Sequence, residues 1–138
     1  MDKIDSERQL IRVIGDFLEM GHLDNILAMF SQDPSHYRLS GELLRDERFR
    51  VRLGLAVLFE QLAAERPAEV QQAIPFLLPL LAEASPLLRG EAANLLGTIG
   101  TPEALAPLKE LRHDPDPQVA EIVADLLVSS ACETGRGR

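Results

Sequence analysis

The chain has 138 residues, enough for one domain with a sizeable core, and 46% of them are hydrophobic whereas only 4% are aromatic. Its 14 basic and 22 acidic side chains give a formal charge of −8, which disfavours binding to nucleic-acid phosphates and to anionic membranes. Cys132 is the single cysteine, which excludes a disulfide within the chain, and no signal peptide or membrane span is evident, so we expect a cytoplasmic protein.

Apolar residues recur at helical spacing along almost the whole chain, and strand-like alternation is scarce, so the pattern predicts an all-α fold. We expect a first helix that ends near Gly21, a second from Leu23 to the turn "SQDPS", a short third element over 37–45, and a fourth helix that stops before Pro67. One domain is expected over 1–131, with an irregular N-terminal cap at 1–45, regular repeats over 46–131 and a flexible tail at 132–138.

Three segments can be aligned as internal repeats: "RFRVRLGLAVLFEQL" (48–62), "SPLLRGEAANLLGTI" (85–99) and "DPQVAEIVADLLVSS" (116–130). Their common anchor positions are Val51, Leu88 and Val119, and an alanine follows each anchor five residues later, at Ala56, Ala93 and Ala124. Small residues at this position let the second helix of each repeat approach its neighbours closely.

The stretch "LGTIGTPEALAPLKELRHDPDPQVAEIVADLL" resembles a HEAT repeat, through its Gly-x-x-Gly-x-Pro-Glu-Ala hinge and its Asp-Pro-Asp-Pro-x-Val turn. The resemblance implies an α-solenoid of about four antiparallel helical hairpins in a right-handed superhelical stack. It also implies that an arginine after the anchor pairs with the turn aspartate of a neighbouring repeat. Arg52 and Arg89 fit that position, whereas Ala120 departs from it.

The glycines of "LLGTIGTPEALAP" (95–107) are compatible with a phosphate-binding loop or with the joint between two packed helices. No buried strand precedes them and no basic residue follows until Lys109, which favours the joint. Gly97 and Gly100 then suit left-handed residues that end a helix, and Thr101 suits the cap of the next one.

Catalytic and metal sites have little support in the sequence. His22, His36 and His113 fall near turns and have no partner at metal-ligand spacing. HEAT-repeat deoxyhypusine hydroxylases bind iron through His-Glu dipeptides, and this chain contains none. We therefore expect no catalytic, metal-binding or cofactor-binding residue, no cofactor, and a protein that is not an enzyme.

Four arginines crowd the segment "LLRDERFRVRLG" (43–54), and guanidinium groups suit an anionic anchor on a partner. Alternatively, Arg52 belongs to the repeat ladder while the others pair with neighbouring acids such as Glu42, Asp46 and Glu47. Phe49, between the arginines, is either core or an exposed anchor. With the polar residues expected on the inner face of the repeats, the candidate partner-binding set is Arg45, Arg48, Arg50, Arg52, Arg89, Glu91, Asn94, Glu121 and Asp125.

The leading hypothesis is a non-catalytic scaffold or adaptor that binds another protein through its repeat surface. The alternative is a chaperone subunit or a chromophore lyase similar to the phycobilin lyases, with a small molecule in the groove, although the scarcity of aromatic residues weakens it. A third hypothesis, a resemblance to HEAT-like alkylpurine DNA glycosylases, requires a basic face that the acidic second half lacks. We expect a protein partner, no nucleic acid, no membrane, and a monomer or weak homodimer.

Overall fold

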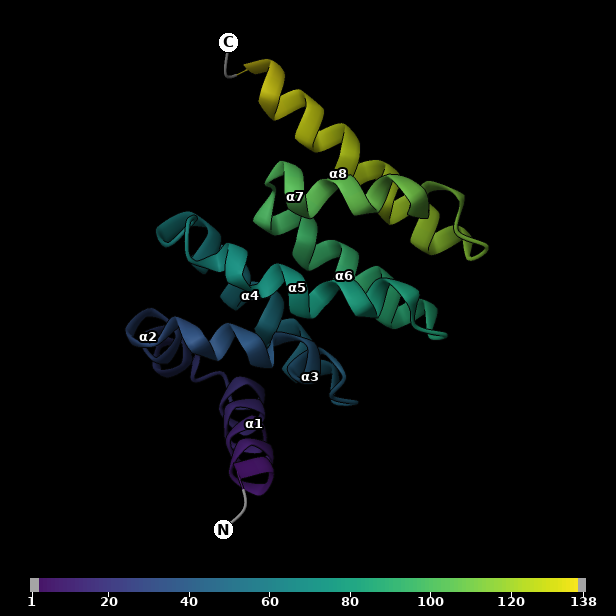
Figure 1. Ribbon diagram of the computed structural model, residues 1–138. Coiled ribbons are helices and arrows are strands. Elements are labelled where there is room, and N and C mark those ends of the chain that lie inside the picture. Colours follow the sequence, from purple (N-terminus) through teal and green to yellow (C-terminus); the bar gives the residue numbers. More distant parts are fainter. Residues whose placement is uncertain (1–2, 137–138) are drawn as a thin grey trace. The chain divides into compact units, whose positions relative to one another are not determined.

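The computed structural model describes residues 3–136, except for the side chains of Ile4 and of residues 131–136. The chain divides into two compact units, Met1–Ala73 (unit 1) and Ile74–Arg138 (unit 2), and each is described by itself. Every regular element within residues 3–136 is helical, so the predicted all-α class is confirmed (Figure 1).

Unit 1 begins with two helices and continues with a helical hairpin. Its elements in chain order are α1 (Lys3–Glu19), α2 (Leu23–Gln32), the 3₁₀ helix η1 (Pro34–Leu39), α3 (Ser40–Leu44), α4 (Phe49–Glu65) and the 3₁₀ helix η2 (Val70–Ala73). The first helix ends at Glu19, and Gly21 just after it adopts a positive φ of 83° that favours glycine, so the predicted end near Gly21 is confirmed. The short third element is also confirmed, as η1 followed by α3.

The core of unit 1 is built around α4, against which α1, α2 and α3 pack. Three buried aromatic rings meet edge to face in this core: Tyr37 lies 5.1 Å from Phe30 and 6.4 Å from Phe59, measured between ring centroids. Gly54 lets α1 approach α4, because a Cβ added there would lie 3.2 Å from the Leu18 carbonyl oxygen.

Unit 2 consists of two helical hairpins whose first helices are partly wound as 3₁₀. Its elements are α5 (Ile74–Leu77), η3 (Leu78–Ala82), α6 (Pro86–Ile99), α7 (Pro102–Leu105), η4 (Ala106–His113) and α8 (Pro117–Arg136). Pro79 and Pro107 lie at the starts of η3 and η4 and have no backbone N–H to donate to an α-helical bond. The prolines therefore account for the change of winding within each first helix.

The joint between α6 and α7 is a helix end followed by a helix cap. Gly100 ends α6 in the left-handed conformation, with φ of 74°, and the Thr101 side chain accepts a hydrogen bond from the Ala104 N–H. Gly97, in contrast, lies inside α6, so its predicted left-handed conformation is wrong. Its role is packing, because an added Cβ would lie 2.6 Å from Cδ2 of Leu126 on α8.

Two of the expected boundaries stay predictions. Residues 1–45 include the regular helices α1 and α2, which share a unit with α4. At the other end, α8 continues in helical form to Arg136, while residues 137–138 lie outside the described part, so the mobility of 132–138 is an open prediction.

Candidate functional site

The loop before α4 is tied to α1 by the guanidinium group of Arg48. Its Nη1 donates to Asp16 Oδ1 at 2.8 Å and to Glu19 Oε1 at 3.0 Å, while Nε and Nη2 donate to the two carboxylate oxygens of Asp46. The hydrogen bond from Arg48 holds the pKa of Asp46 below its usual range. Gly15 makes room for this group, since a Cβ there would lie 2.9 Å from Arg48 Nη2.

Arg48 therefore links two elements of unit 1 and has its hydrogen-bonding groups occupied within the protein. Sequence reasoning proposed neighbouring acids as its partners and found Asp46. It missed Asp16 and Glu19, which lie 32 and 29 residues away along the chain, because only the packing of α1 on α4 brings them to the arginine.

Arg52 and Arg89 occupy equivalent places in two repeats and bind their own loops in the same way. Arg52 Nη1 donates to the carbonyl oxygens of Asp46 and Glu47, six and five residues before it. Arg89 Nη1 donates to the carbonyls of residues 83 and 84, at the same two spacings. The two arginines thus close the turn that precedes each second helix.

Arg89 also makes the contact between repeats that the HEAT resemblance implied. Its Nε and Nη2 bind both carboxylate oxygens of Asp114 at 2.8 and 2.9 Å, and only 3% of the Asp114 side chain is exposed. The hydrogen bonds from Arg89 lower the pKa of Asp114. This predicted pairing is confirmed within unit 2.

The other two arginines of the basic cluster are more open. Arg45 lies 3.8 Å from Glu42 through its Nε, at the edge of ion-pair distance. Arg50 is exposed and forms no hydrogen bond or ion pair with any described residue. Of the four clustered arginines, Arg50 is the one that the described part of the chain leaves available to a partner.

Exposed apolar residues form a row on one face of α4. Phe49, Leu53 and Val57 follow one another at four-residue spacing and are 63%, 51% and 37% exposed, whereas Val51 and Leu55 on the opposite face are fully buried. Residues four apart lie on the same face of a helix, so the three side chains are neighbours. Phe49 is therefore exposed rather than part of the core.

Sequence reasoning did not select Leu53 or Val57, because it assigned the inner face by looking for polar residues. The repeat alignment does contain a signal that distinguishes Leu53 and Val57 from the equivalent residues of the other repeats. Two and six residues after the anchors, the later repeats have glycine or polar residues, namely Gly90 and Asn94, then Glu121 and Asp125. In α4 the same two positions hold leucine and valine.

The predicted partner-binding residues of unit 2 are distributed over α6 and α8, which pack against each other. Asn94, Glu121 and Asp125 are exposed, and Glu91 is partly buried. Glu121 and Asp125 lie one helical turn apart and form no ion pair with the described residues. Their role in binding stays a prediction.

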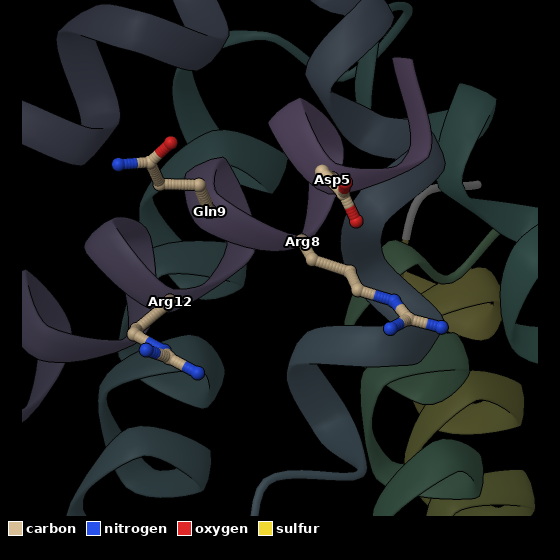
Figure 2. Close-up of a pocket in the computed structure, with 4 residues that line it drawn as sticks. All are labelled: Asp5, Arg8, Gln9 and Arg12. Atoms are coloured by element: carbon tan, nitrogen blue, oxygen red, sulfur yellow. The ribbon is translucent and has the colours of Figure 1, made fainter. Parts of the chain in front are cut away.

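A shallow depression of about 340 Å³ lies along α1 and was not anticipated from the sequence. Figure 2 shows its lining side chains projecting from this one helix: Asp5, Arg8, Gln9 and Arg12. Arg8 and Arg12 are exposed and unpaired among the described residues, and the described residues that line the depression all belong to α1, so no second described element encloses an anion between them.

Each histidine lies at or near the end of a helix. His36 Nδ1 lies 2.9 Å from the Asp33 carbonyl oxygen, and His22 packs edge to face on Phe17, so both have local roles at helix ends. His113 is exposed at the end of η4. Within the described residues, no group of three or more histidine, cysteine or acidic side chains could hold a metal ion.

Two buried polar atoms in unit 1 lack a hydrogen-bond partner within the described part of the chain, the hydroxyl of Tyr37 and Oε2 of Glu69. Burial, together with the nearby charge of Glu69, raises the pKa of Tyr37 to about 12. The phenol therefore stays protonated at physiological pH.

Comparison with known proteins gives a family and one partial relative. Residues 38–127, more than half of the chain, match a family model described as HEAT repeats. A protein named deoxyhypusine hydroxylase, from Eremothecium gossypii, is 33% identical over 75 residues, which cover 54% of this chain and 23% of that protein. No solved structure matches. Within residues 3–136, no helix combines the length and apolar character needed to cross a membrane.

The similarity to a hydroxylase corrects one prediction from the sequence. We expected that this chain is not an enzyme, on the ground that it has no His-Glu dipeptide and no paired nucleophile. That prediction is contradicted, because a protein named as an enzyme shares a third of the aligned residues over about half of the chain. Among the described residues, no cluster of histidine and acidic side chains fits an iron ion.

Proposed function

Because the chain belongs to the HEAT-repeat family, we propose that it is a protein-interaction module that binds a protein partner through the exposed face of α4. Repeat proteins of this kind offer an extended helical surface rather than an enclosed pocket. The predicted interaction scaffold is kept as a proposal. Of the candidate partner-binding residues, Arg50 is kept in the proposed surface, and the apolar row of α4 is added to it.

The observation that carries the proposal is the exposure of Phe49, Leu53 and Val57 on one helix face. A lone exposed leucine is ordinary on a protein surface, but three large apolar side chains in a row form a patch that water solvates poorly. Interface cores have this composition, with apolar residues at the centre and polar residues at the rim. Arg50, beside the row, supplies such a rim charge.

The arginines bonded within the protein are less suited to that role. Arg48 is held by three carboxylates, and Arg89 by Asp114 and two carbonyls. A partner would have to displace these bonds before it could use either guanidinium group, at a cost that an exposed apolar row does not carry.

Site-specific crosslinking tests the proposal. A photoreactive phenylalanine analogue replaces Leu53, and the purified protein is irradiated in a lysate of the organism that makes it. We expect a discrete crosslinked protein from position 53. The matched control places the same analogue at Leu87 on α6, which is 54% exposed and outside the row. Equal yields from positions 53 and 87, or no crosslinked protein from 53, would contradict the proposal.

The similarity to deoxyhypusine hydroxylase supports a second candidate function, hydroxylation of a deoxyhypusine residue. The matched segment spans 23% of that relative, so the activity of the whole enzyme is a proposal for this chain. Incubation with a deoxyhypusine-containing protein under aerobic, reducing conditions, with and without ferrous iron, would be followed by mass spectrometry. A gain of one oxygen atom is the expected result for this candidate, and an unchanged mass rejects it.

A further inference from the structure

The exposed face of α4 has a charge pattern that is complementary to itself. Arg50, Leu53, Val57 and Glu60 follow each other at spacings of three, four and three residues, which places them in a second row along the helix that shares Leu53 and Val57 with the apolar row. All four are exposed, and neither Arg50 nor Glu60 forms an ion pair or hydrogen bond with a described residue. The row thus has a cation at one end, an anion at the other and aliphatic side chains between them.

This row is symmetric about position 55 of the chain. Arg50 and Glu60 lie five residues on either side of it, and Leu53 and Val57 lie two residues on either side. When two identical helices pack antiparallel across a two-fold axis, residues equidistant from the axis face each other. The two-fold at position 55 would therefore bring Arg50 against Glu60 of a second copy and Leu53 against Val57 of a second copy.

We infer that the partner of the α4 face is a second copy of this chain, bound as an antiparallel α4–α4 pair. The inference rests on the proposed function, for which it names the partner. Two ion pairs and two leucine–valine contacts form at once around the axis, because a two-fold interface makes each contact twice. Spacings of three and four residues are those that keep a seam facing its partner in paired helices.

The geometry also sets the strength of the association. The seam involves one helix from each copy and is shorter than an interface of standard size, so we expect a dissociation constant on the order of 100 µM. The end ion pairs are exposed at the rim, where opposite charges contribute modestly and like charges oppose binding, so they select the antiparallel register. We therefore expect a weak dimer whose dissociation constant rises with the salt concentration.

Charge reversal with the full chain tests the register. Sedimentation equilibrium from about 10 µM to about 1 mM should show a monomer–dimer equilibrium for the wild type. Arg50→Glu places two glutamates against each other, and Glu60→Arg places two arginines against each other, so each variant alone should associate at least about tenfold more weakly. An equimolar mixture of the two variants should dimerise again, because every end pair then joins opposite charges. The double variant R50E/E60R should also recover.

Controls separate this interface from a general effect of charge or folding. Arg112→Glu reverses an exposed charge in unit 2 and should leave association unchanged. Leu53→Asp should abolish the dimer, whereas Leu87→Asp, at similar exposure, should not. Circular dichroism and thermal melts of each variant establish that it is folded. Because all these side chains are exposed, the variants are expected to retain the wild-type fold.

Three results would overturn the inference. They are a wild type that stays monomeric to about 1 mM, a mixture of R50E and E60R that associates no better than either variant alone, or a dimer indifferent to Leu53→Asp. Crosslinking from position 53 distinguishes a failure of the dimer inference from a failure of the proposed protein-binding function. A different protein captured there, together with a monomeric chain, rejects the second copy and leaves the protein-binding function standing.

Discussion

The guanidinium group of Arg89 binds both carboxylate oxygens of Asp114, with Nε 2.8 Å from Oδ2 and Nη2 2.9 Å from Oδ1. This bidentate pair joins α6 to the loop before α8, and 12% of the arginine and 3% of the aspartate side chain are exposed. The same arginine closes its own loop through two carbonyl oxygens, so one side chain holds two successive turns of unit 2 together.

Replacing Arg89 should destabilise unit 2 more than replacing any exposed arginine. Arg89→Ala leaves the buried carboxylate of Asp114 with the backbone N–H of Asp116 as its remaining donor among the described residues, and it removes the side-chain donor of two carbonyl oxygens. We expect the melting temperature to fall by on the order of 5–10 °C. Differential scanning calorimetry measures the change. Arg112→Ala is the matched control, since Arg112 is exposed and unpaired in the described part of the chain, and equal shifts for the two variants would contradict this role.

The lowered pKa of Asp114 predicts a stability contribution that depends on pH. A carboxyl group whose pKa is lower in the folded state stabilises the fold above its unfolded value, near 3.8, and loses that contribution as the pH falls through its folded value. Asp114→Asn should therefore be less stable than wild type near neutral pH, with the difference shrinking as the pH falls below about 4. Urea unfolding at a series of pH values measures it. A difference that stays constant into strong acid would argue against the ion pair as its source.

Tyr37 is the single tyrosine in a chain without tryptophan, so its ionisation can be followed by absorbance without interference. The folded protein should show a tyrosinate transition near pH 12, and the protein in urea a transition near its usual value of 10. Because the unfolded phenol ionises first, stability should fall as the pH rises above 10. Tyr37→Phe should remove this alkaline loss. A folded-state transition at the ordinary value would contradict the burial of the phenol.

The contact between Gly97 and Leu126 predicts a coupled pair of substitutions. Gly97→Ala raises helix propensity by about 1 kcal/mol, but its methyl group meets the leucine side chain, and such overpacking costs about 1–3 kcal/mol. We expect a net loss of stability that disappears when Leu126→Ala is the background. Denaturant unfolding of the four proteins in the double-mutant cycle gives the coupling energy, and additive effects would mean that the two positions do not touch.

Local chemistry made much of the fold predictable. The helix period gave the all-α class, and a glycine or a capping residue marked ends such as Gly21, Gly100 and Thr101, because each acts within a few residues of itself. The resemblance to HEAT repeats, and not the spacing itself, implied the pairing of Arg89 with the turn aspartate. The helix period and the helix ends depend on spacing along the chain, which the sequence displays directly.

Features that depend on packing between distant segments were not predictable in the same way. The acids of α1 that bind Arg48 lie about thirty residues before it, and nothing in their spacing marks them. Gly97 was assigned to a turn because glycine suits both turns and close helix contacts, and only Leu126 decides between them. The exposed row on α4 was missed because the inner face was assigned from polar residues, whereas the corresponding positions of α4 hold leucine and valine.

The acids of two repeat loops are bound by arginines from different places, and this difference affects where a further repeat could be added. Asp46 and Asp114 stand at the same register position, but Asp114 receives Arg89 from the hairpin before it, whereas Asp46 receives Arg48 from its own loop. An extra hairpin could be inserted between α6 and α7 if it carried an acid in its loop and an arginine after its anchor. The added acid would accept hydrogen bonds from Arg89, and the added arginine would donate to Asp114. Inserted before α4, the hairpin would meet an acid that is already occupied. Lengthening by whole repeats is thus compatible with the interior of unit 2, whereas at the first loop an added arginine would compete with Arg48 for Asp46.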